Sequence, residues 1–491
     1  MPLSFDILIV GAGLSGIGAG YHVQSQCPRH RYAILEARES MGGTWDLFRY
    51  PGIRSDSDMY TLGYPFFPWE EGKAIADGPA ILHYIRRTAA HFGIDQHIRY
   101  QQRVVKAAWS SADAQWTVDV EAGPDRTLKQ YSCRYLYLCA GYYDYSAGYS
   151  PSFTGIERFQ GRVVHPQKWT SDIDYAGKRV VVIGSGATAV TLVPEMAKTA
   201  AHVTMLQRTP TYIARLPSQD KFANRLRRWL PSQTAFNVAR WKNVLHSMLF
   251  YQVARRAPDV MKWLLKKGVQ AGVGATCDMR HFTPPYNPWD QRLCVVPDGD
   301  LFVTLKAGRA SIVTDQIDTF TETGIALRSG QHLDADLVVT ATGLKLKLMG
   351  GMELIVDGNA VKLSDCHVYK GMMLSNVPNL AFAVGYTNAS WTLKADLSSR
   401  YFCRLIKYME QRGYVQCRPR VKGALLDEPL IDFSSGYVQR DLASLPRQGN
   451  RRPWKLYQNY LLDLMTLGYR SVSDNMEFVK SSQKTGTRSQ E

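Results

Sequence analysis

Residues 7–16 read Ile-Leu-Ile-Val-Gly-Ala-Gly-Leu-Ser-Gly. The first four residues are apolar and partly β-branched, which favours a buried strand. Glycines follow at positions 11, 13 and 16, and a run of small residues then continues toward residue 26. A strand, a glycine turn and a helix in this order form the first unit of a doubly wound parallel fold. We therefore predict an α/β chain built on this unit.

The glycine spacing predicts a dinucleotide site. A pyrophosphate binds the unpaired N–H groups at a helix N-terminus, and it approaches the backbone so closely that side chains are excluded. On this interpretation Gly11 permits the tight turn, Gly13 the close approach, and Gly16 the packing of helix on strand. Glu36 ends the next predicted strand, 25 residues after Gly11. A carboxylate there accepts hydrogen bonds from ribose hydroxyls and repels a 2′-phosphate, which predicts FAD.

A second unit repeats this plan further along the chain. Four apolar residues at 180–183 precede another glycine turn, and the strand after it ends at Gln207 and Arg208. The predicted contacts of this turn are Ile183, Gly184, Ser185, Gly186, Ala187, Thr188 and Ala189. A cation such as Arg208 at the strand end suits the 2′-phosphate of NADP. FAD and NADPH together imply electron transfer from a nicotinamide to a flavin.

The composition agrees with a globular enzyme of several domains. The 491 residues are 45% hydrophobic and 21% charged. The formal charge of +16 is compatible with nucleic acid, an acidic membrane surface or anionic cofactors as partners. Nucleic acid is not expected, because no zinc-finger, RNP or homeodomain pattern is present.

The remaining sequence features favour a reduced, cytoplasmic protein without a metal. None of the eight cysteines forms a CxxC pair. The N-terminus lacks the pattern of a signal peptide, and no uncharged apolar run approaches the ~20 residues that span a bilayer. The polar residues 481–491 are expected to be disordered.

The order of predicted elements indicates nested domains. Strand patterns stop after Pro210 and resume near residue 300, and the intervening segment has helical spacing. A buried strand is predicted to begin at Asp336 and to end in a turn at Gly343, and residues 391–412 look helical. We expect FAD-binding parts at 1–145 and 336–491, NADP-binding parts at 146–215 and 289–335, and a helical insertion at 216–288.

Two segments narrow the class of flavin enzyme. Gly42-Gly43-Thr44-Trp45 lies where flavin disulfide reductases carry a redox cysteine pair, and no such pair is present. Residues 159–169 contain Phe159, Gly161, His165 and Trp169. This FxGxxxHxxxW spacing resembles the fingerprint of Baeyer–Villiger monooxygenases. The family usually continues with Pro or Asp, whereas this chain has Thr170.

The resemblance extends over about residues 5–475. Segments 49–60, 287–294 and 385–391 resemble the bacterial ethionamide-activating members of the family. It implies that ketones are converted to esters or lactones through a peroxide at flavin C4a, with oxidation of sulfides or thioamides as further activities. Two alternatives stay open. One is a flavin-containing monooxygenase of sulfur or nitrogen, and the other is a flavin-bound NADPH oxidase or electron-transfer protein.

The same resemblance implies roles for individual residues. Arg292 would stabilise the anions of the reaction, and Asp56 would position it next to the cofactor. The implied contacts to FAD are Ser15, Thr44, Trp45, Asp46, Leu47 and Val104, and those to NADP are Arg54, Ser55 and the 183–189 turn. Many members have Lys before the active arginine, but this chain has Gln291, so preference for NADPH would depend mainly on Arg208. The fingerprint is expected to couple domains, and His165 is not expected to be a general base.

The helical insertion is unusually basic. Residues 221–267 contain one acidic residue, Asp259, and aromatic residues interleave with the cations. Its basic residues include Arg225, Arg227, Arg228, Arg240, Lys242, Arg255, Arg256, Lys262, Lys266 and Lys267. We favour a helical cap over the substrate pocket with solvated charges. Peripheral contact with an anionic membrane is the alternative.

Overall fold

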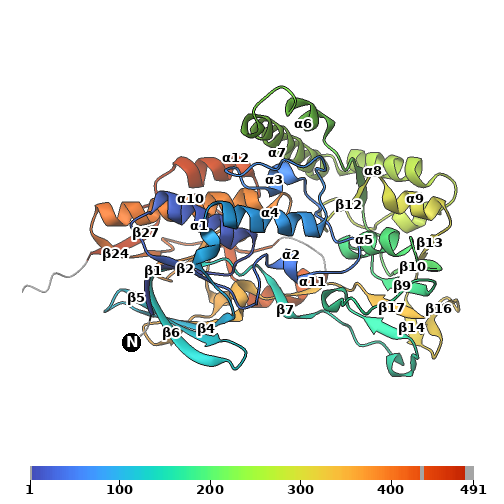
Figure 1. Ribbon diagram of the computed structural model, residues 1–491, viewed down its shortest axis with the longest axis horizontal. Coiled ribbons are helices and arrows are strands. Elements are labelled where there is room, and N and C mark those ends of the chain that lie inside the picture. Colours follow the sequence, from blue (N-terminus) through green and yellow to red (C-terminus); the bar gives the residue numbers. More distant parts are fainter. Residues whose placement is uncertain (1–2, 432–435, 481–491) are drawn as a thin grey trace, which may run out of the picture.

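The computed structural model describes residues 3–431 and 436–480, and a mixed sheet and a parallel sheet form its centre (Figure 1). The predicted tail at 481–491 lies outside the described residues. The first sheet has nine strands: β20 (Asn359–Ala360), β19 (Glu353–Val356), β4 (Gln102–Ser110), β5 (Gln115–Ala122), β6 (Thr127–Leu138), β1 (Leu3–Val10), β2 (Tyr32–Leu35) and β3 (Ile98–Arg99) in order, with β23 (Leu380–Phe382) also paired to β6.

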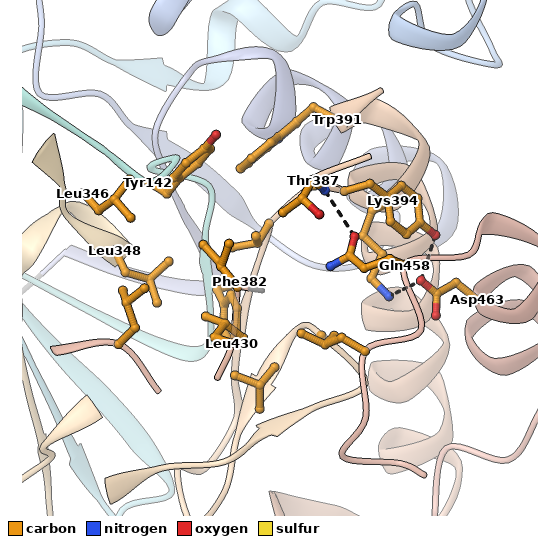
Figure 2. Close-up of a pocket in the computed structure, with 18 of the residues that line it drawn as sticks. Tyr142, Leu346, Leu348, Phe382, Thr387, Trp391, Lys394, Leu430, Gln458 and Asp463 are labelled. Atoms are coloured by element: carbon orange, nitrogen blue, oxygen red, sulfur yellow. Dashed lines mark hydrogen bonds and ion pairs between the residues drawn. The ribbon is translucent and has the colours of Figure 1, made fainter. Parts of the chain in front are cut away.

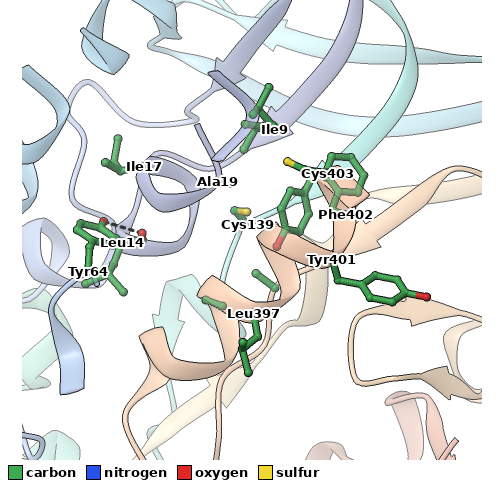
Figure 3. Close-up of a cluster of buried hydrophobic side chains, with 14 of the residues drawn as sticks. Ile9, Leu14, Ile17, Ala19, Tyr64, Cys139, Leu397, Tyr401, Phe402 and Cys403 are labelled. Carbon is green, nitrogen blue, oxygen red and sulfur yellow. Dashed lines mark hydrogen bonds between the residues drawn. The ribbon is translucent and has the colours of Figure 1, made fainter. Parts of the chain in front are cut away.

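The centre of the first sheet is the predicted strand–turn–helix unit. β1 pairs in parallel with β2 and β6, and Ile7, Leu8 and Ile9 are fully buried. Helix α1 (Leu14–Gln26) covers one face and packs against α10 (Trp391–Gln411). Figure 3 shows the apolar core between them, where Phe402 and Cys403 of α10 lie toward Ile9. The C-terminal part of the chain therefore completes the first domain.

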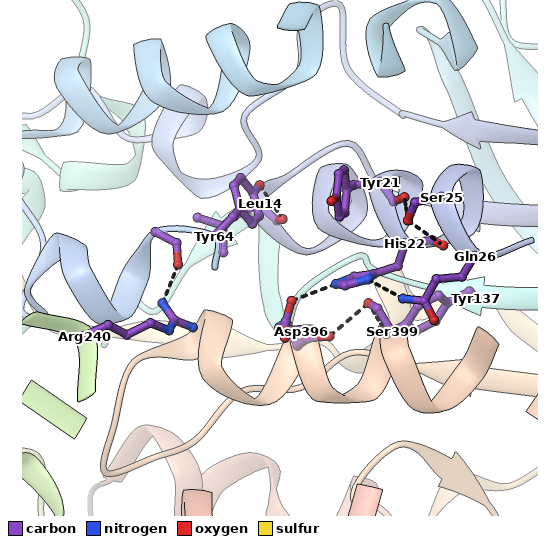
Figure 4. A network of polar contacts seen from close by, with 12 residues as sticks. Leu14, Tyr21, His22, Ser25, Gln26, Tyr64, Tyr137, Arg240, Asp396 and Ser399 are labelled. Atoms are coloured by element: carbon purple, nitrogen blue, oxygen red, sulfur yellow. Dashed lines mark hydrogen bonds and ion pairs between the residues drawn. The ribbon is translucent and has the colours of Figure 1, made fainter. Parts of the chain in front are cut away.

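A polar network crosses the same helix pair (Figure 4). The buried His22 of α1 contacts the carboxylate of Asp396 on α10 at 2.7 Å, while Gln26 donates a hydrogen bond to the other ring nitrogen of His22 at 2.8 Å. Because an unpaired buried carboxylate is costly, this pairing fixes how α1 sits on α10.

The second sheet has five parallel strands. In order they are β13 (Ala310–Thr314), β10 (His202–Gln207), β9 (Arg179–Ile183), β17 (Leu337–Thr340) and β8 (Arg162–Val164). We expected the second NADP-binding part to end at residue 335 and the second FAD-binding part to begin at residue 336. This boundary is wrong, because β17 pairs with β8 and β9 rather than with the first sheet. When an apolar strand is buried on both faces, its own sequence does not indicate which sheet it joins.

Short pieces connect and extend the sheets. The linking strands β7 (Tyr143–Gly148) and β18 (Leu344–Leu346) pair with each other. An antiparallel group of β14 (Ile317–Phe320), β15 (Gly324–Leu327) and β16 (His332–Asp334) follows β13. β11 (Ile213–Leu216) pairs with β12 (Cys294–Pro297), so one strand lies inside the stretch expected to lack strands.

The insertion between these strands is helical, as predicted. It contains α6 (Lys221–Leu226), α7 (Ser232–Arg256) and α8 (Pro258–Val273), and α6 and α7 lie along the upper edge of the molecule in Figure 1. The inner face of α7 packs on α3 (Met59–Leu62). There the buried Arg240 donates hydrogen bonds to the carbonyl oxygens of Tyr60 and Gly63, each at 2.8 Å, at the C-terminal end of α3.

The other helices are α2 (Thr44–Leu47), α4 (Gly78–His91), α5 (Ala187–Met196), α9 (Asp300–Lys306), α11 (Gly436–Asp441) and α12 (Tyr460–Asp463), which continues as a π-helix over Leu464–Tyr469. None of the helices in residues 3–431 and 436–480 has both the length and the apolar character required to cross a membrane.

Candidate active site

The two glycine turns open into one cleft. Its volume is about 3430 Å³, part of it open to solvent. The first turn contributes Gly13 and Ser15, and the second contributes residues 183–188. Parallel α/β sheets bind ligands beyond the carboxyl ends of their strands, and both turns follow such an end. The cleft is therefore the place where two dinucleotides can meet.

The first turn has the close packing that its glycines predict. Gly11 has φ +101°, and a Cβ there would lie 2.6 Å from the carbonyl oxygen of Cys139. A Cβ on Gly16 would lie 1.8 Å from the carbonyl oxygen of Gly11. Gly13 has no such contact under 3.4 Å and caps α1 without a side-chain hydrogen bond. The N-terminus of α1 therefore presents free N–H groups to the cleft.

Glu36 lies directly beneath this turn. Its carboxylate accepts hydrogen bonds from the backbone N–H of Ala12 at 2.7 Å and of Arg38 at 3.0 Å. Burial raises its pKa, and the two N–H groups oppose that rise. Glu36 thus holds the turn from the end of β2, the position that the sequence assigned to the ribose contact.

The second turn is equally free of side-chain caps. Gly184 has φ +134°, and a Cβ there would lie 2.4 Å from the carbonyl oxygen of Ala341. Gly186 precedes α5, and a Cβ there would meet no atom within 4 Å. The open space at Gly186 and the uncapped helix fit a pyrophosphate that approaches the backbone. Arg208 follows β10 and lines the same part of the cleft.

Arg292 lies where the cleft meets a smaller pocket. Its Nε is 3.5 Å from a carboxylate oxygen of Asp56, and a terminal N–H donates to the carbonyl oxygen of Thr387 at 3.3 Å. Arg54 also lines the cleft and forms an ion pair with Asp300 at the start of α9. The guanidinium of Arg292 is thus held from two sides at the centre of the site.

Two aromatic residues that the sequence did not single out border Arg292. Tyr142 and Trp391 stack with ring centroids 5.1 Å apart, and Trp391 Nε1 donates a hydrogen bond to Ser15 Oγ at 2.7 Å. Burial is the main cause that raises the pKa of Tyr142, followed by the neighbouring Tyr143, while Arg292 opposes the rise. Trp391 was part of a segment used for the resemblance, but nothing in the sequence marked its ring as part of the site.

The smaller pocket is mainly apolar and has a volume of about 60 Å³ (Figure 2). Tyr142, Arg292 and Trp391 line both it and the cleft. Its apolar lining includes Leu346, Leu348, Val368, Phe382, Leu430 and Leu456. Figure 2 shows a polar group to one side, where Lys394 Nζ lies 2.8 Å from Asp463 and Thr387 donates its N–H to Gln458 at 3.1 Å. A mainly apolar lining with a few polar groups is typical of a small-molecule site.

Comparisons with known proteins decide the family. A family model described as flavin-binding monooxygenase-like matches residues 55–412, which is more than half of the chain. A model described as an NAD(P)-binding Rossmann-like domain matches residues 9–69. The chain belongs to the flavin-binding monooxygenase-like family.

The relatives of this flavin monooxygenase cover its whole length. The FAD-containing monooxygenase EthA of Mycobacterium tuberculosis (strain ATCC 25618 / H37Rv) is 52% identical over 484 residues, which is 98% of this chain and 99% of the relative. A solved structure of an oxidized steroid monooxygenase bound to NADP has a TM-score of 0.76 at 22% identity, with 97% of this chain and 100% of that chain covered. OTEMO in complex with FAD and NADP has a TM-score of 0.73 at 20% identity, with 98% and 100% covered.

These findings bear on the expectations from sequence. The mixed α/β fold with dinucleotide-binding domains, the class of flavin monooxygenase and the cofactor pair FAD and NADP are confirmed. The residues that hold the cofactors, and their roles, remain predictions.

Most of the predicted cofactor residues of this flavin monooxygenase line the cleft, but several do not. Thr44, Trp45, Arg54, Ser55 and Asp56 line it. Asp46 instead accepts hydrogen bonds from Arg38, Ser40 and Arg86 at 2.6–3.1 Å. The other predicted cofactor residues outside the lining are Gly11, Gly16, Glu36, Leu47, Val104, Ala189 and Gln207. The amide of Gln207 donates instead to the His281 carbonyl oxygen at 2.8 Å.

Among the fingerprint residues, His165 contacts the segments that link the two sheets. His165 Nε2 is 3.1 Å from the carbonyl oxygen of Gly343, and the N–H of Gln167 donates to its Nδ1 at 3.2 Å. A Cβ on Gly148 would lie 2.0 Å from the imidazole ring. Burial is the main cause that lowers the pKa of His165. The neutral ring therefore joins the end of β7 to the turn after β17.

The other fingerprint residues pack around the second sheet, with Phe159 and Trp169 in different apolar clusters. Phe159 is buried against Phe320, and a Cβ on Gly161 would lie 2.4 Å from the ring of Phe159. Trp169 packs edge-on against Tyr175. None of the four lines the cleft. This placement agrees with a role in coupling the domains.

Proposed function

We propose that this flavin monooxygenase is an FAD- and NADPH-dependent Baeyer–Villiger enzyme. It converts ketones to esters or lactones and also oxidises soft sulfides or thioamides. The net reaction consumes ketone, O₂, NADPH and a proton, and it yields ester, NADP⁺ and water. The relatives EthA, a steroid monooxygenase and OTEMO support the class of chemistry but not a particular substrate.

The observation that carries the proposal is the position of Arg292. It belongs to the linings of both the cleft and the apolar pocket, and Asp56 and the Thr387 carbonyl oxygen hold it there. A guanidinium stays charged at every physiological pH and does not readily give up a proton. It can therefore stabilise an oxyanion without protonating the oxygen nucleophile that attacks the ketone.

The pocket, Arg292 and Asp56 have different roles in the proposed reaction. The bound flavin, reduced by the nicotinamide, supplies activated oxygen. The pocket binds the apolar part of the ketone and leaves its carbonyl group at Arg292. The guanidinium then stabilises the negative charge that forms on the carbonyl oxygen, an effect worth about 3–4 kcal/mol for one preorganised donor. Asp56 positions the guanidinium rather than touching the substrate.

The nicotinamide side depends on the second glycine turn. The free N-terminus of α5 binds the pyrophosphate, and Arg208 at the end of β10 binds the 2′-phosphate of NADPH. Gln291 is uncharged and lines the cleft beside Arg292, so it supplies no second cation for that phosphate.

The direct test is oxygen transfer to a ketone. Purified protein with bound FAD is incubated with NADPH, ¹⁸O₂ and a panel of aliphatic and aryl ketones, and products are analysed by mass. We expect an ester that carries one labelled oxygen atom. NADPH consumption that yields only hydrogen peroxide would overturn the proposal in favour of an oxidase. Oxidation of sulfides with no ester from any ketone would instead favour a sulfur monooxygenase.

A further inference from the structure

The outer face of α7 carries an uncovered apolar stripe. Val238, Trp241, Leu245 and Leu249 are spaced three or four residues apart, so they share one side of the helix. All four are exposed, Leu245 at 53% and Leu249 at 64%. The opposite side of α7 is the one that packs on the protein, through Ala235, Phe236, Ala239 and Val244. The helix is therefore apolar on two sides, and only one of them is covered.

Neighbouring elements extend this stripe. Trp229, in the turn between α6 and α7, is 81% exposed. Lys242 lies over the ring of the exposed Phe222 of α6 at 5.1 Å, and Trp241 contacts Tyr460 of α12 with ring centroids 5.9 Å apart. Leu461 and Met465, which follow Tyr460, are exposed as well. Apolar side chains gathered in this way mark an interaction surface rather than the usual scatter of single residues.

The charge of the same insertion is almost purely positive. Residues 221–273 contain eleven lysines and arginines and one acidic residue, Asp259. Arg225 and Arg228 of the α6 region and Arg256 at the end of α7 are exposed. Exposed Trp and Leu beside Lys and Arg are the composition of helices that lie in the interface of an anionic bilayer. A solvated cap accounts for the charges but not for the exposed Trp229, Leu245 and Leu249.

We propose that the α7 surface, defined by Phe222, Trp229, Val238, Trp241, Leu245, Leu249, Leu461 and Met465, docks on a bilayer that contains anionic lipids. The apolar side chains enter the acyl boundary, and the exposed arginines contact the lipid phosphates. The membrane contact is peripheral and reversible, and it depends on both apolar insertion and charge.

A narrow hollow lies beneath α7. Its volume is about 10 Å³, and it lies between α7 and the segments around Asn388 and Tyr460. Gln458 lines both this hollow and the apolar pocket, and Ala389 lines both the hollow and the cleft. The docked face thus lies on the outer side of the helix whose inner side borders this narrow hollow.

The test is flotation with vesicles, which does not depend on oxygenation. Full-length holoprotein is mixed with vesicles of phosphatidylcholine alone or with phosphatidylglycerol added, at low and at high salt. We expect flotation with the anionic vesicles at low salt and much less with the neutral ones. The variant Leu245→Ser/Leu249→Ser should reduce the bound fraction at least tenfold. These two side chains line neither the hollow nor the site, so NADPH oxidation with a water-soluble ketone should be unchanged.

A matched control replaces two exposed apolar residues outside the α7 surface with serine. Leu128→Ser/Val303→Ser changes two exposed apolar residues, at 74% and 58% exposure, on β6 and α9. This variant should float like the wild type. No flotation of the wild type, or equal loss in both variants, would overturn the proposal. A dimer in analytical ultracentrifugation that Leu245→Ser/Leu249→Ser dissociates would also overturn it, since the face would then bind a second copy of the chain.

Discussion

Arg208 is the cation that the end of β10 presents to the cleft. If Arg208 binds the 2′-phosphate, the Arg208→Ala substitution should weaken the binding of NADPH far more than the binding of NADH. A hydrogen-bonded charge of this kind is worth about 1.5–3 kcal/mol, which corresponds to a loss of roughly tenfold to 150-fold in the preference for NADPH. Steady-state kcat/KM with each dinucleotide measures the effect. Arg309→Ala, an exposed arginine outside the cleft, is the matched control and should leave the ratio unchanged.

His165 gives a prediction about pH. Burial lowers the pKa of its ring in the folded state, whereas the unfolded chain titrates near the ordinary value of about 6.5. Below that pH the unfolded state takes up more protons, so folded stability decreases as the pH falls. We expect the melting temperature of the wild type to drop more between pH 7.5 and 5.5 than that of His165→Gln. Equal drops in both proteins would show that His165 is not the buried neutral ring described above.

At the residue scale the sequence located charged and glycine residues but missed aromatic ones. Gly11, Gly16, Arg208 and Arg292 belong to patterns whose chemistry requires those residue types. The Tyr142–Trp391 stack belongs to no such sequence pattern, because its two side chains lie 249 positions apart. Each of these residues could equally belong to an ordinary apolar core. Contacts of this kind depend on the tertiary fold and leave no local signal.

At the element scale, a Gly→Ala substitution should have different effects in the two glycine turns. In Gly16→Ala the new Cβ would lie 1.8 Å from the Gly11 carbonyl oxygen, so the turn must shift. We expect a lower melting temperature and less bound flavin per chain. In Gly186→Ala the Cβ meets no protein atom within 4 Å, so folding and flavin content should be normal. The KM for NADPH should rise, since the Cβ occupies the space that the pyrophosphate approaches. A Gly186→Ala protein with unchanged KM would remove the second turn from the site.

The elements also show where prediction from sequence succeeds. The strand–turn–helix units, the strand that ends near Gly343 and the helix over 391–411 follow from local patterns of apolar residues and glycine. The sheet that β17 joins, and the pairing of β11 with β12, depend on partners far away in the sequence. The local pattern specifies that a segment is a buried strand, but only packing specifies its neighbours.

At the scale of the whole molecule the site exists because three distant segments meet. Asp56 follows the first domain's glycine-rich loops, Arg292 comes from the end of the insertion, and Thr387 precedes α10. His165 contacts the turn after β17, close in the chain to the linking strand β18. The position of Arg292 relative to the pocket therefore depends on how these distant segments pack.

The most direct test of the account measures ester formation by Arg292→Ala, with Arg309→Ala as a control. If the guanidinium stabilises the oxyanion, ester formation should fall by about 10²–10³-fold. Flavin content should stay normal, and NADPH should still be oxidised with release of hydrogen peroxide. An Arg292→Ala protein that retains its flavin and forms ester at the wild-type rate would contradict the account.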